Sequence, residues 1–222
     1  MSEPSSEPSP EPPSESSREL WVVRHGQTAW ALAKRHTGLT DVPLTEVGEA
    51  GARRLAAALA ATPFDRVVSS PLQRARRTAE LAGFSDVEVD PRALEWDYGD
   101  YEGLTRAEIS RWVPDWRPFE HPQMPGGENL SQVAARADSL LADLMGEPGA
   151  TGDDRSGGDG DGDDVRRVLL FAHAHFLRVL TVRWLGQPPA LAAHLVLDPT
   201  TIGILGEDRG TRALLRWNAP VP

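Results

Sequence analysis

Two short apolar segments, residues 20–23 and 168–171, each end two residues before a histidine, at a point where a strand would give way to a helix. Short apolar strands that alternate with helices are typical of parallel sheets, in which ligands bind outside the carboxyl ends of the strands. His25 and His173 are therefore predicted to lie at a ligand site. Arg24 directly precedes His25. An arginine fork suits phosphate, and a neutral imidazole can attack phosphorus, so the pattern favours a phosphate ligand.

Capping residues mark most of the predicted helices. Thr45 is expected to cap a helix to about residue 60, Ser70 one to about 81, and Asn129 one to about 145, while Thr105 and Glu108 form the capping box of a short helix. A last helix is expected to end near residue 185. The other strands are expected at 66–68, 87–89, 201–205 and 213–217. This alternation predicts an α/β fold: a three-layer sandwich with a mostly parallel central sheet, helices on both faces and an antiparallel edge.

Two segments have a composition that does not suit a packed core. Residues 1–18 are rich in Ser, Pro and Glu, and residues 146–164 are rich in Gly and Asp. Such segments bury too little apolar surface to offset the entropy of ordering. We expect a disordered tail at 1–18 and a single domain at 19–222 that contains a flexible insertion at 146–164. Residues 1–17 and 146–164 account for the whole formal net charge of −10, so the rest of the chain is balanced.

The charge pattern and composition exclude several classes of partner. No basic stripe stands out, so nucleic acid is not expected as a partner. A calcium-binding loop that starts at Asp159 needs Gly at its sixth position and Glu at its twelfth, where this chain has Asp164 and Leu170, so no metal site is predicted. The chain has no cysteine. Its first residues do not resemble a secretory signal, and its most apolar stretch contains two histidines and two arginines, so a cytoplasmic protein without a membrane span is expected.

A third strand-to-helix junction adds charge to the predicted site. Residues 69–74 read Ser-Ser-Pro-Leu-Gln-Arg, which puts Arg74 in the first turn of a helix. Free N–H groups and the helix dipole already favour phosphate at such a position. The amide of Ala174, next to His173, offers another donor. Three junctions thus offer arginine, histidine and N–H groups to one anion.

At this point the chain resembles the histidine phosphatases, the phosphoglycerate mutase-like superfamily. The resemblance covers residues 20–205 and rests on five blocks in the family's order: Arg24 to Trp30; Thr37-Gly38 with Pro43-Leu44-Thr45; Ser69 to Ala75; Glu95 to Gly103 with Gly126-Gly127-Glu128; and His173. It implies the phosphoglycerate mutase-like α/β fold. It also implies a cytoplasmic phosphoric monoester hydrolase that acts on small phosphorylated metabolites through a phosphohistidine.

The resemblance also implies roles for individual residues. His25 would be the nucleophile, and Glu95 would protonate the leaving oxygen and then activate water. Arg24, Arg74 and His173 would hold the phosphoryl group. Further phosphate or substrate contacts are implied for Gln27, Thr37, Gly38, Tyr98 and Ala174. Because the arginines and His173 supply positive charge, no metal or cofactor is expected. A cationic neighbourhood should also keep His25 neutral.

Two departures from the family pattern bear on the reaction. Ala31 stands where the mutase branch usually has Asn, and the stretch between Glu95 and His173 is short once the Gly/Asp insertion is set aside. Both favour an open pocket and hydrolysis over a 2,3-bisphosphoglycerate-dependent phosphoglycerate mutase. A catalytically inactive phosphate-binding regulatory protein is a further alternative, against which the presence of His25 and Glu95 argues.

Other features remain without a functional assignment. His175 is expected to face solvent or to cap the helix, and His36 has no supporting context. An exposed edge strand would permit a homodimer.

Overall fold

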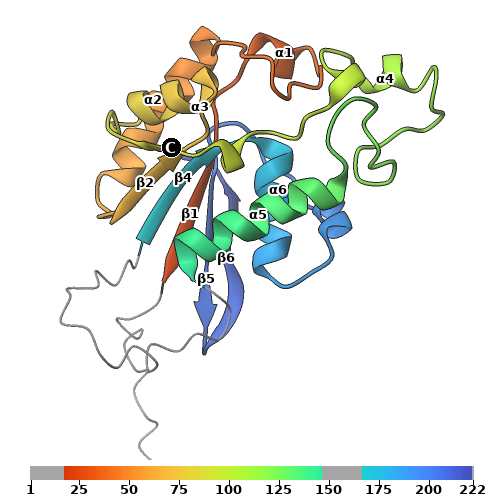
Figure 1. Ribbon diagram of the computed structural model, residues 1–222. Helices are drawn as coiled ribbons and strands as arrows, with labels where there is room; N and C mark the ends of the chain where they lie inside the picture. Colours follow the sequence, from red (N-terminus) through yellow and green to blue (C-terminus); the bar gives the residue numbers. More distant parts are fainter. Residues whose placement is uncertain (1–17, 147–166, 222) are drawn as a thin grey trace, which may run out of the picture.

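A six-stranded mixed sheet forms the centre of the protein (Figure 1). The computed structural model describes residues 18–146 and 167–221. The predicted tail at 1–18 and insertion at 146–164 therefore lie outside the described residues, apart from Arg18 and Gly146. The strand order is β3-β2-β4-β1-β5-β6. The strands are β1 (Glu19–Arg24), β2 (Arg66–Ser69), β3 (Glu88–Val89), β4 (Arg167–Ala172), β5 (Ile202–Asp208) and β6 (Thr211–Ala219).

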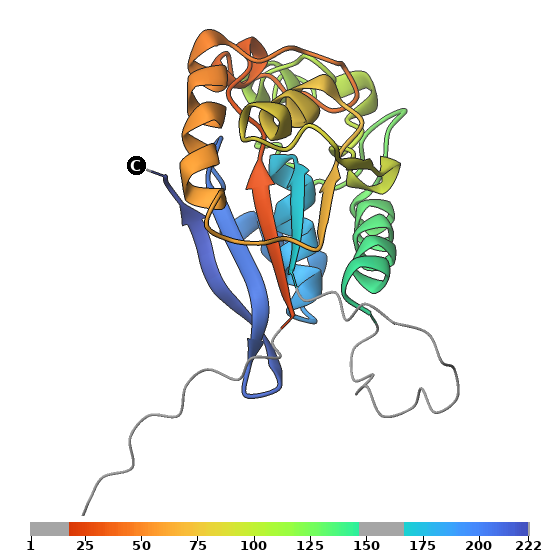
Figure 2. The ribbon, with the colours of Figure 1, turned by 90° about the vertical axis from the view of Figure 1, so that its left-hand side faces the viewer.

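Five of the six strands run in the same direction, and β5 runs against them. β4 pairs in parallel with both β1 and β2, and β2 pairs in parallel with β3, whereas β5 and β6 form an antiparallel edge. Figure 2 shows the arrowheads of β1, β2 and β4 pointing toward the same end of the molecule. The prediction of a mostly parallel sheet with an antiparallel edge is confirmed. The carboxyl ends of β1, β2 and β4 therefore share one edge.

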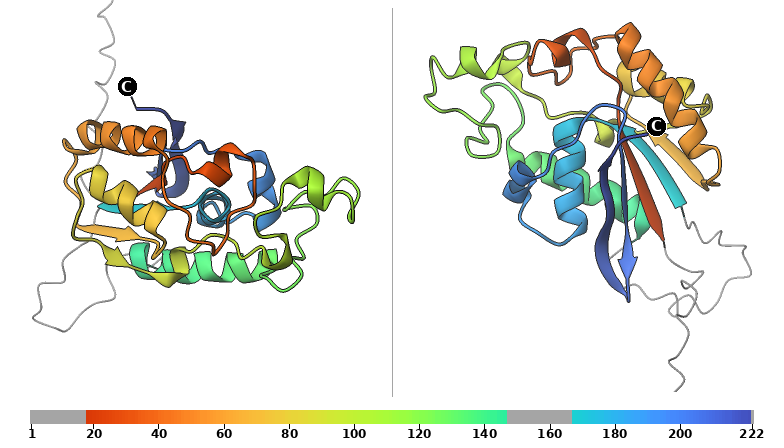
Figure 3. Two further views of the ribbon diagram at one scale, coloured as in Figure 1. Left: turned by 90° about the horizontal axis from the view of Figure 1, so that it is seen from above. Right: turned by 180° about the vertical axis from the view of Figure 1, so that it is seen from behind.

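Helices cover both faces of the sheet, as Figure 3 shows from above. One face packs against α2 (Glu46–Leu59) and α3 (Gln73–Leu81), and the other against α5 (Leu130–Met145) and α6 (Ala174–Trp184). The alternation of side chains along a strand explains the two cores. In β4, Leu169 and Phe171 enter the first core, while Val168 and Leu170 enter the second. This is the predicted three-layer sandwich.

Short helices connect the main elements at the carboxyl edge of the parallel strands and elsewhere. They are α1 (Ala29–Leu32), α4 (Arg106–Ile109) and the 3-10 turns η1 (Pro91–Ala93), η2 (Gly99–Tyr101) and η3 (Pro189–His194). α1 and the 3-10 turns were not expected from the sequence. None of the helices within residues 18–146 and 167–221 combines the length and apolarity needed to cross a membrane.

The helix caps follow the prediction with one exception. Thr45 caps α2, Asn129 and Gln132 form a capping box on α5, and Thr105 caps α4. The exception is α3, which begins at Gln73 rather than directly after Ser70. The Ser70 N–H extends the sheet by donating to the Phe171 carbonyl, and its hydroxyl bonds to His173. Ser70 is therefore engaged in the sheet and the site, so it does not cap the helix.

Candidate active site

The two histidines singled out by the sequence lie side by side. His25 follows β1 and His173 follows β4, and these strands are paired neighbours. The His25 N–H donates to the Ala172 carbonyl at 3.0 Å, which continues the ladder up to the site. The two ring centroids are 5.1 Å apart. Both residues are buried. The parallel pairing of β1 and β4 thus brings together residues that are far apart in the chain.

Arg74 enters this cluster from the first turn of α3 and is fully buried. Its Nε donates to Nδ1 of His173 at 3.2 Å. Its terminal nitrogens donate to the carbonyls of Thr40 and Gly38 at 2.8 and 2.7 Å. Because arginine only donates, Nδ1 of His173 accepts and carries no proton. The ring proton of His173 is therefore on Nε2, which donates to the Ser70 hydroxyl at 2.8 Å. The backbone around Arg74 therefore fixes both the guanidinium and the tautomer of His173.

Arg24 brings a second guanidinium to the cluster, and one of its donors has no partner. One terminal nitrogen donates to the Leu197 carbonyl at 2.6 Å. The Nε atom is buried without a hydrogen-bond partner, a state shared within the described residues only by the indole nitrogen of Trp116. Buried donors are nearly always satisfied in folded proteins. The guanidinium charge of Arg24, which acts directly on His25, is suited to an anion.

The surroundings of His25 keep its imidazole neutral. Burial, followed by the positive charges of Arg74 and Arg24, lowers the pKa of His25 well below the ordinary value of 6.5. Nδ1 lies 2.7 Å from the Gly26 carbonyl, which can only accept, so Nδ1 carries the ring proton. Nε2 is then the nitrogen with a free lone pair. The expectation of a neutral His25 is confirmed.

Glu95 is held at the amino end of α6. Its Oε1 accepts from the backbone N–H groups of Trp96 and Phe176 at 2.9 and 2.8 Å, and its Oε2 accepts from the N–H of His175 at 3.1 Å. The residue is 5% exposed. These three donors hold the carboxyl group of Glu95 in place.

A cavity of about 380 Å³ opens onto these residues. Of the predicted site residues, those that line it are Arg24, His25, Thr37, Glu95, Tyr98 and Ala174. Arg74 and His173 do not line the cavity, because both are fully buried beside His25. Gln27 and Gly38 are also absent from its lining. The side-chain oxygen of Gln27 accepts a hydrogen bond from the Thr45 hydroxyl, and the backbone N–H of Gly38 donates to the Glu102 carboxylate.

The structure adds His175 to the residues around the cavity and corrects the expectation for it. Its side chain neither faces bulk solvent nor caps α6. It is partly buried, lines the cavity and hydrogen-bonds through Nδ1 to the Tyr98 hydroxyl. Burial lowers the pKa of His175 well below its ordinary value. The sequence signal was its place two residues after His173, in the first turn of a helix whose amino end faces the site.

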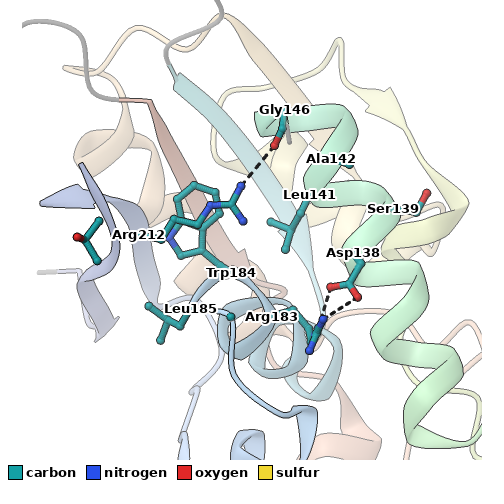
Figure 4. A pocket seen from close by; sticks show the side chains of 11 residues that line it. Asp138, Ser139, Leu141, Ala142, Gly146, Arg183, Trp184, Leu185 and Arg212 are labelled. Carbon is teal, nitrogen blue, oxygen red and sulfur yellow. Dashed lines mark hydrogen bonds and ion pairs between the residues drawn. The ribbon is translucent and has the colours of Figure 1, made fainter. Parts of the chain in front are cut away.

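A second cavity, of about 580 Å³, lies between α5, α6 and the hairpin of β5 and β6 (Figure 4). It is lined by Trp184, Leu141 and the ion pair between Arg183 and Asp138. Arg212 lies over the Trp184 ring at 4.2 Å. None of the predicted site residues lines this cavity, so the candidate active site is the smaller one.

Comparisons with known proteins agree with this geometry. The sequence profile of the histidine phosphatase superfamily (branch 1) matches residues 20–220. An acid phosphatase of Mycobacterium tuberculosis is 37% identical over 197 residues, which cover 88% of this chain and 89% of that protein. A glucosyl-3-phosphoglycerate phosphatase of the same species is 34% identical over 180 residues, 78% of each chain. These phosphatase names support hydrolysis over the mutase alternative.

A solved structure has the same fold. It is that of the product of the open reading frame Rv3214 from Mycobacterium tuberculosis, which superposes with a TM-score of 0.81 at 35% identity and covers 92% of this chain and 99% of its own. The profile match, the relatives and the fold lead to one conclusion. The chain is a member of the histidine phosphatase superfamily, branch 1.

Proposed function

We propose that the protein hydrolyses phosphomonoesters of small metabolites through a phosphohistidine on His25. The proposal rests above all on one observation: a neutral, buried imidazole with a free Nε2 lies among Arg24, Arg74 and His173. Phosphoryl transfer needs positioning and positive charge more than covalent chemistry. The two guanidinium groups supply that charge, so the reaction is proposed to need no metal or cofactor.

In the first step, Nε2 of His25 attacks phosphorus while the bond to the ester oxygen breaks. The protonated form of Glu95 gives its proton to that oxygen, so the alcohol leaves neutral. The ring becomes a phosphorylated cation whose Nδ1–H still donates to the Gly26 carbonyl. The guanidinium charges of Arg24 and Arg74 neutralise the phosphoryl oxygens. The Nε2–H of His173, donated here to Ser70, is the proton it would offer to a phosphoryl oxygen.

In the second step, water attacks phosphorus and the Nε2–P bond breaks. Glu95, now a carboxylate, takes a proton from the water, and inorganic phosphate forms. Thr37, Tyr98 and Ala174 line the cavity and are proposed to contact phosphate or substrate. Gln27 and Gly38, whose polar groups bond to Thr45 and Glu102, are proposed to act through the loop that carries them.

Replacing the nucleophile tests the proposal. His25→Ala should lower phosphate release from p-nitrophenyl phosphate by about three orders of magnitude or more, because no phosphoenzyme can form. His194→Ala, at an exposed histidine, is the matched control and should keep its activity. The wild-type protein, quenched in alkali during turnover, should carry phosphate on His25 by mass spectrometry. Undiminished turnover in His25→Ala, with a native circular dichroism spectrum, would remove His25 from the mechanism.

The nearest rival activity is a phosphoglycerate mutase. Family membership alone does not separate the two, because some relatives carry mutase names. The two activities differ in whether the product alcohol is held and rephosphorylated or released to water. Ala31 lines the cavity, and its methyl group offers no hydrogen bond to a retained product. Assays that follow isomerisation of 3-phosphoglycerate and phosphate release in parallel distinguish them, and dominant isomerisation would favour the mutase.

Three wider expectations remain proposals. We propose that residues 19–222 form a single domain and that the protein is a homodimer. We also propose a cytoplasmic location, because phosphorylated metabolites are charged and do not cross membranes. Support for the dimer comes from β6, an edge strand whose Leu215 is 46% exposed. Light scattering across a dilution series would measure the mass, and a monomer at every concentration would contradict the dimer.

A further inference from the structure

Two histidines beside the acid play no part in the transfer proposed above. His36 and His175 both line the cavity that contains His25 and Glu95. Their rings are nearly parallel, with an interplanar angle of 26° and centroids 6.5 Å apart. The backbone N–H of His175 donates to the Glu95 carboxylate. The two histidines therefore lie next to Glu95, the residue proposed to protonate the leaving oxygen. They are thus placed to contact the alcohol part of a substrate.

Hydrogen bonding fixes the tautomer of His175. Its Nδ1 bonds to the Tyr98 hydroxyl, which is 2% exposed and has no other hydrogen-bond partner within the described part of the chain. Burial raises the pKa of Tyr98 well above its ordinary value, so the phenol keeps its proton. A buried phenol donates to the acceptor it has, so Nδ1 of His175 accepts. The ring is neutral, so its proton is on Nε2, which is a donor.

His36 has the opposite tautomer. Its Nδ1 lies 2.9 Å from the Leu104 carbonyl, which only accepts, so Nδ1 carries the proton. Burial lowers the pKa of His36, so the second nitrogen is unprotonated. Nε2 of His36 is therefore an acceptor. The cavity wall thus offers one neutral donor and one neutral acceptor from two adjacent rings.

Neither of these Nε2 atoms is used by the protein itself. Within residues 18–146 and 167–221, no hydrogen bond involves Nε2 of either ring. Neither atom is among the sealed polar atoms that lack a partner, so both remain accessible. The cavity is the space that both residues line. Because both rings are neutral, they match a neutral polar group better than a second anionic group.

We propose that His36 and His175 form a subsite that recognises a hydroxyl group of the substrate and so selects phosphate esters of polyols over esters of simple alcohols. A hydroxyl both donates and accepts, so it can satisfy the two rings together. A bound ester without a hydroxyl shields both Nε2 atoms from water without giving them hydrogen-bond partners, which disfavours its binding. This inference rests on the proposed phosphatase function and adds a class of substrate to it.

The test compares glycerol 1-phosphate with n-propyl phosphate, which share a carbon skeleton and differ in hydroxyl groups. The ratio of their kcat/KM values should be well above one for the wild-type protein. His36→Asn and His175→Asn keep a polar group near the Nδ1 position and delete Nε2. Each should lower the ratio by about three- to tenfold, the value of one neutral hydrogen bond. The ratio cancels any change common to both substrates.

Conservative variants and a control separate recognition from a structural effect. His36→Gln and His175→Gln return an amide near the Nε2 position, so they should restore part of the ratio. His194→Asn, at an exposed histidine, should leave the ratio at its wild-type value. A wild-type ratio near one, or an unchanged ratio in both Asn variants, overturns the subsite.

The same assays distinguish the subsite from the function on which it rests. Hydrolysis of p-nitrophenyl phosphate by the wild-type protein, without preference for glycerol 1-phosphate, overturns the subsite alone. Release of phosphate from none of the three esters overturns the proposed function and the subsite with it.

Discussion

Burial and two guanidinium groups, rather than an acidic partner, set the charge state of His25. The pKa of this residue lies well below 6.5, with burial as the larger cause and Arg74 and Arg24 as the next. The Gly26 carbonyl acts in the opposite direction and holds the ring proton on Nδ1. A lone pair on Nε2 is thereby present across the neutral pH range.

This arrangement predicts a pH profile. Because only neutral His25 attacks, kcat/KM should not lose activity to protonation of this residue until the pH is well below 6.5. Arg74→Gln removes one cause of the lowered pKa, so its acid limb should move to higher pH. Its maximal rate should also fall by about two to three orders of magnitude, as when a charge-stabilising donor is lost. Profiles of kcat/KM from pH 4.5 to 8 for the wild-type protein and Arg74→Gln check this. Ionisation of the substrate affects both profiles equally, so a difference between their acid limbs reports on the enzyme. An acid limb that stays in place or moves to lower pH would contradict it.

The sequence predicts which side chains meet at the site when those side chains follow strand ends. It does not predict contacts that depend on the path of a loop. His25, Arg74 and His173 follow strands that pair in parallel, so their meeting follows from topology. The Tyr98–His175 contact depends on the path of residues 95–103, which contain no strand or α-helix. No periodicity in the sequence specifies that path. For the same reason, the engagement of the Gly38 amide by Glu102 was not foreseen.

Capping side chains mark where three of the helices begin. The helices α2, α4 and α5 begin where Thr45, Thr105 and Asn129 predict. The start of α3 was misplaced because Ser70, a good capping residue by type, bonds to His173 instead. A cap can be predicted from the sequence only when no tertiary contact competes for its side chain.

The capping box of α5 offers a stability test away from the chemistry. In Asn129→Ala, the N–H of Gln132 loses its side-chain acceptor. The free energy of unfolding should fall by about 1 kcal/mol, and Tm by about 2–4 °C. Ser131→Ala, at an exposed position in the same turn, is the control and should leave Tm unchanged within error. Calorimetry measures both, and equal Tm values for the two variants would show that the cap does not stabilise the helix.

At the scale of the whole molecule, four histidines gather at one place: His25, His36 and His175 line the cavity, and the buried His173 lies beside His25. Burial is the largest cause of the lowered pKa of His25, His36, His173 and His175. Burial keeps these rings neutral, and the hydrogen-bond partners select the tautomer of each ring. The charge of the site therefore comes from arginines, and the histidines supply lone pairs and neutral donors.

These histidines should make the fold sensitive to acid. Below pH 6.5 the unfolded chain binds protons on histidines that the folded protein keeps neutral, so stability falls with falling pH. The slope is up to about 1.4 kcal/mol per pH unit for each histidine, between 6.5 and its lowered pKa. Urea midpoints at pH 7.5, 6.5 and 5.5 measure the decline, and His173→Asn should reduce its slope. His194→Gln, at an exposed position, should leave the slope unchanged. Stability that is constant or rises toward pH 5.5 would contradict this account.

Arg18 hydrogen-bonds to the Met145 carbonyl at the end of α5, and Glu19 lies opposite Arg167 at the amino ends of β1 and β4. His25 and His173 directly follow the carboxyl ends of those strands, and the arrowheads of both strands point toward the opposite end of the molecule (Figure 2). Evolution or an engineer can therefore lengthen, shorten or decorate the polypeptide at one pole while leaving the reacting atoms at the other pole undisturbed. Purification handles, fluorescent reporters or tethers to a partner enzyme belong at that pole.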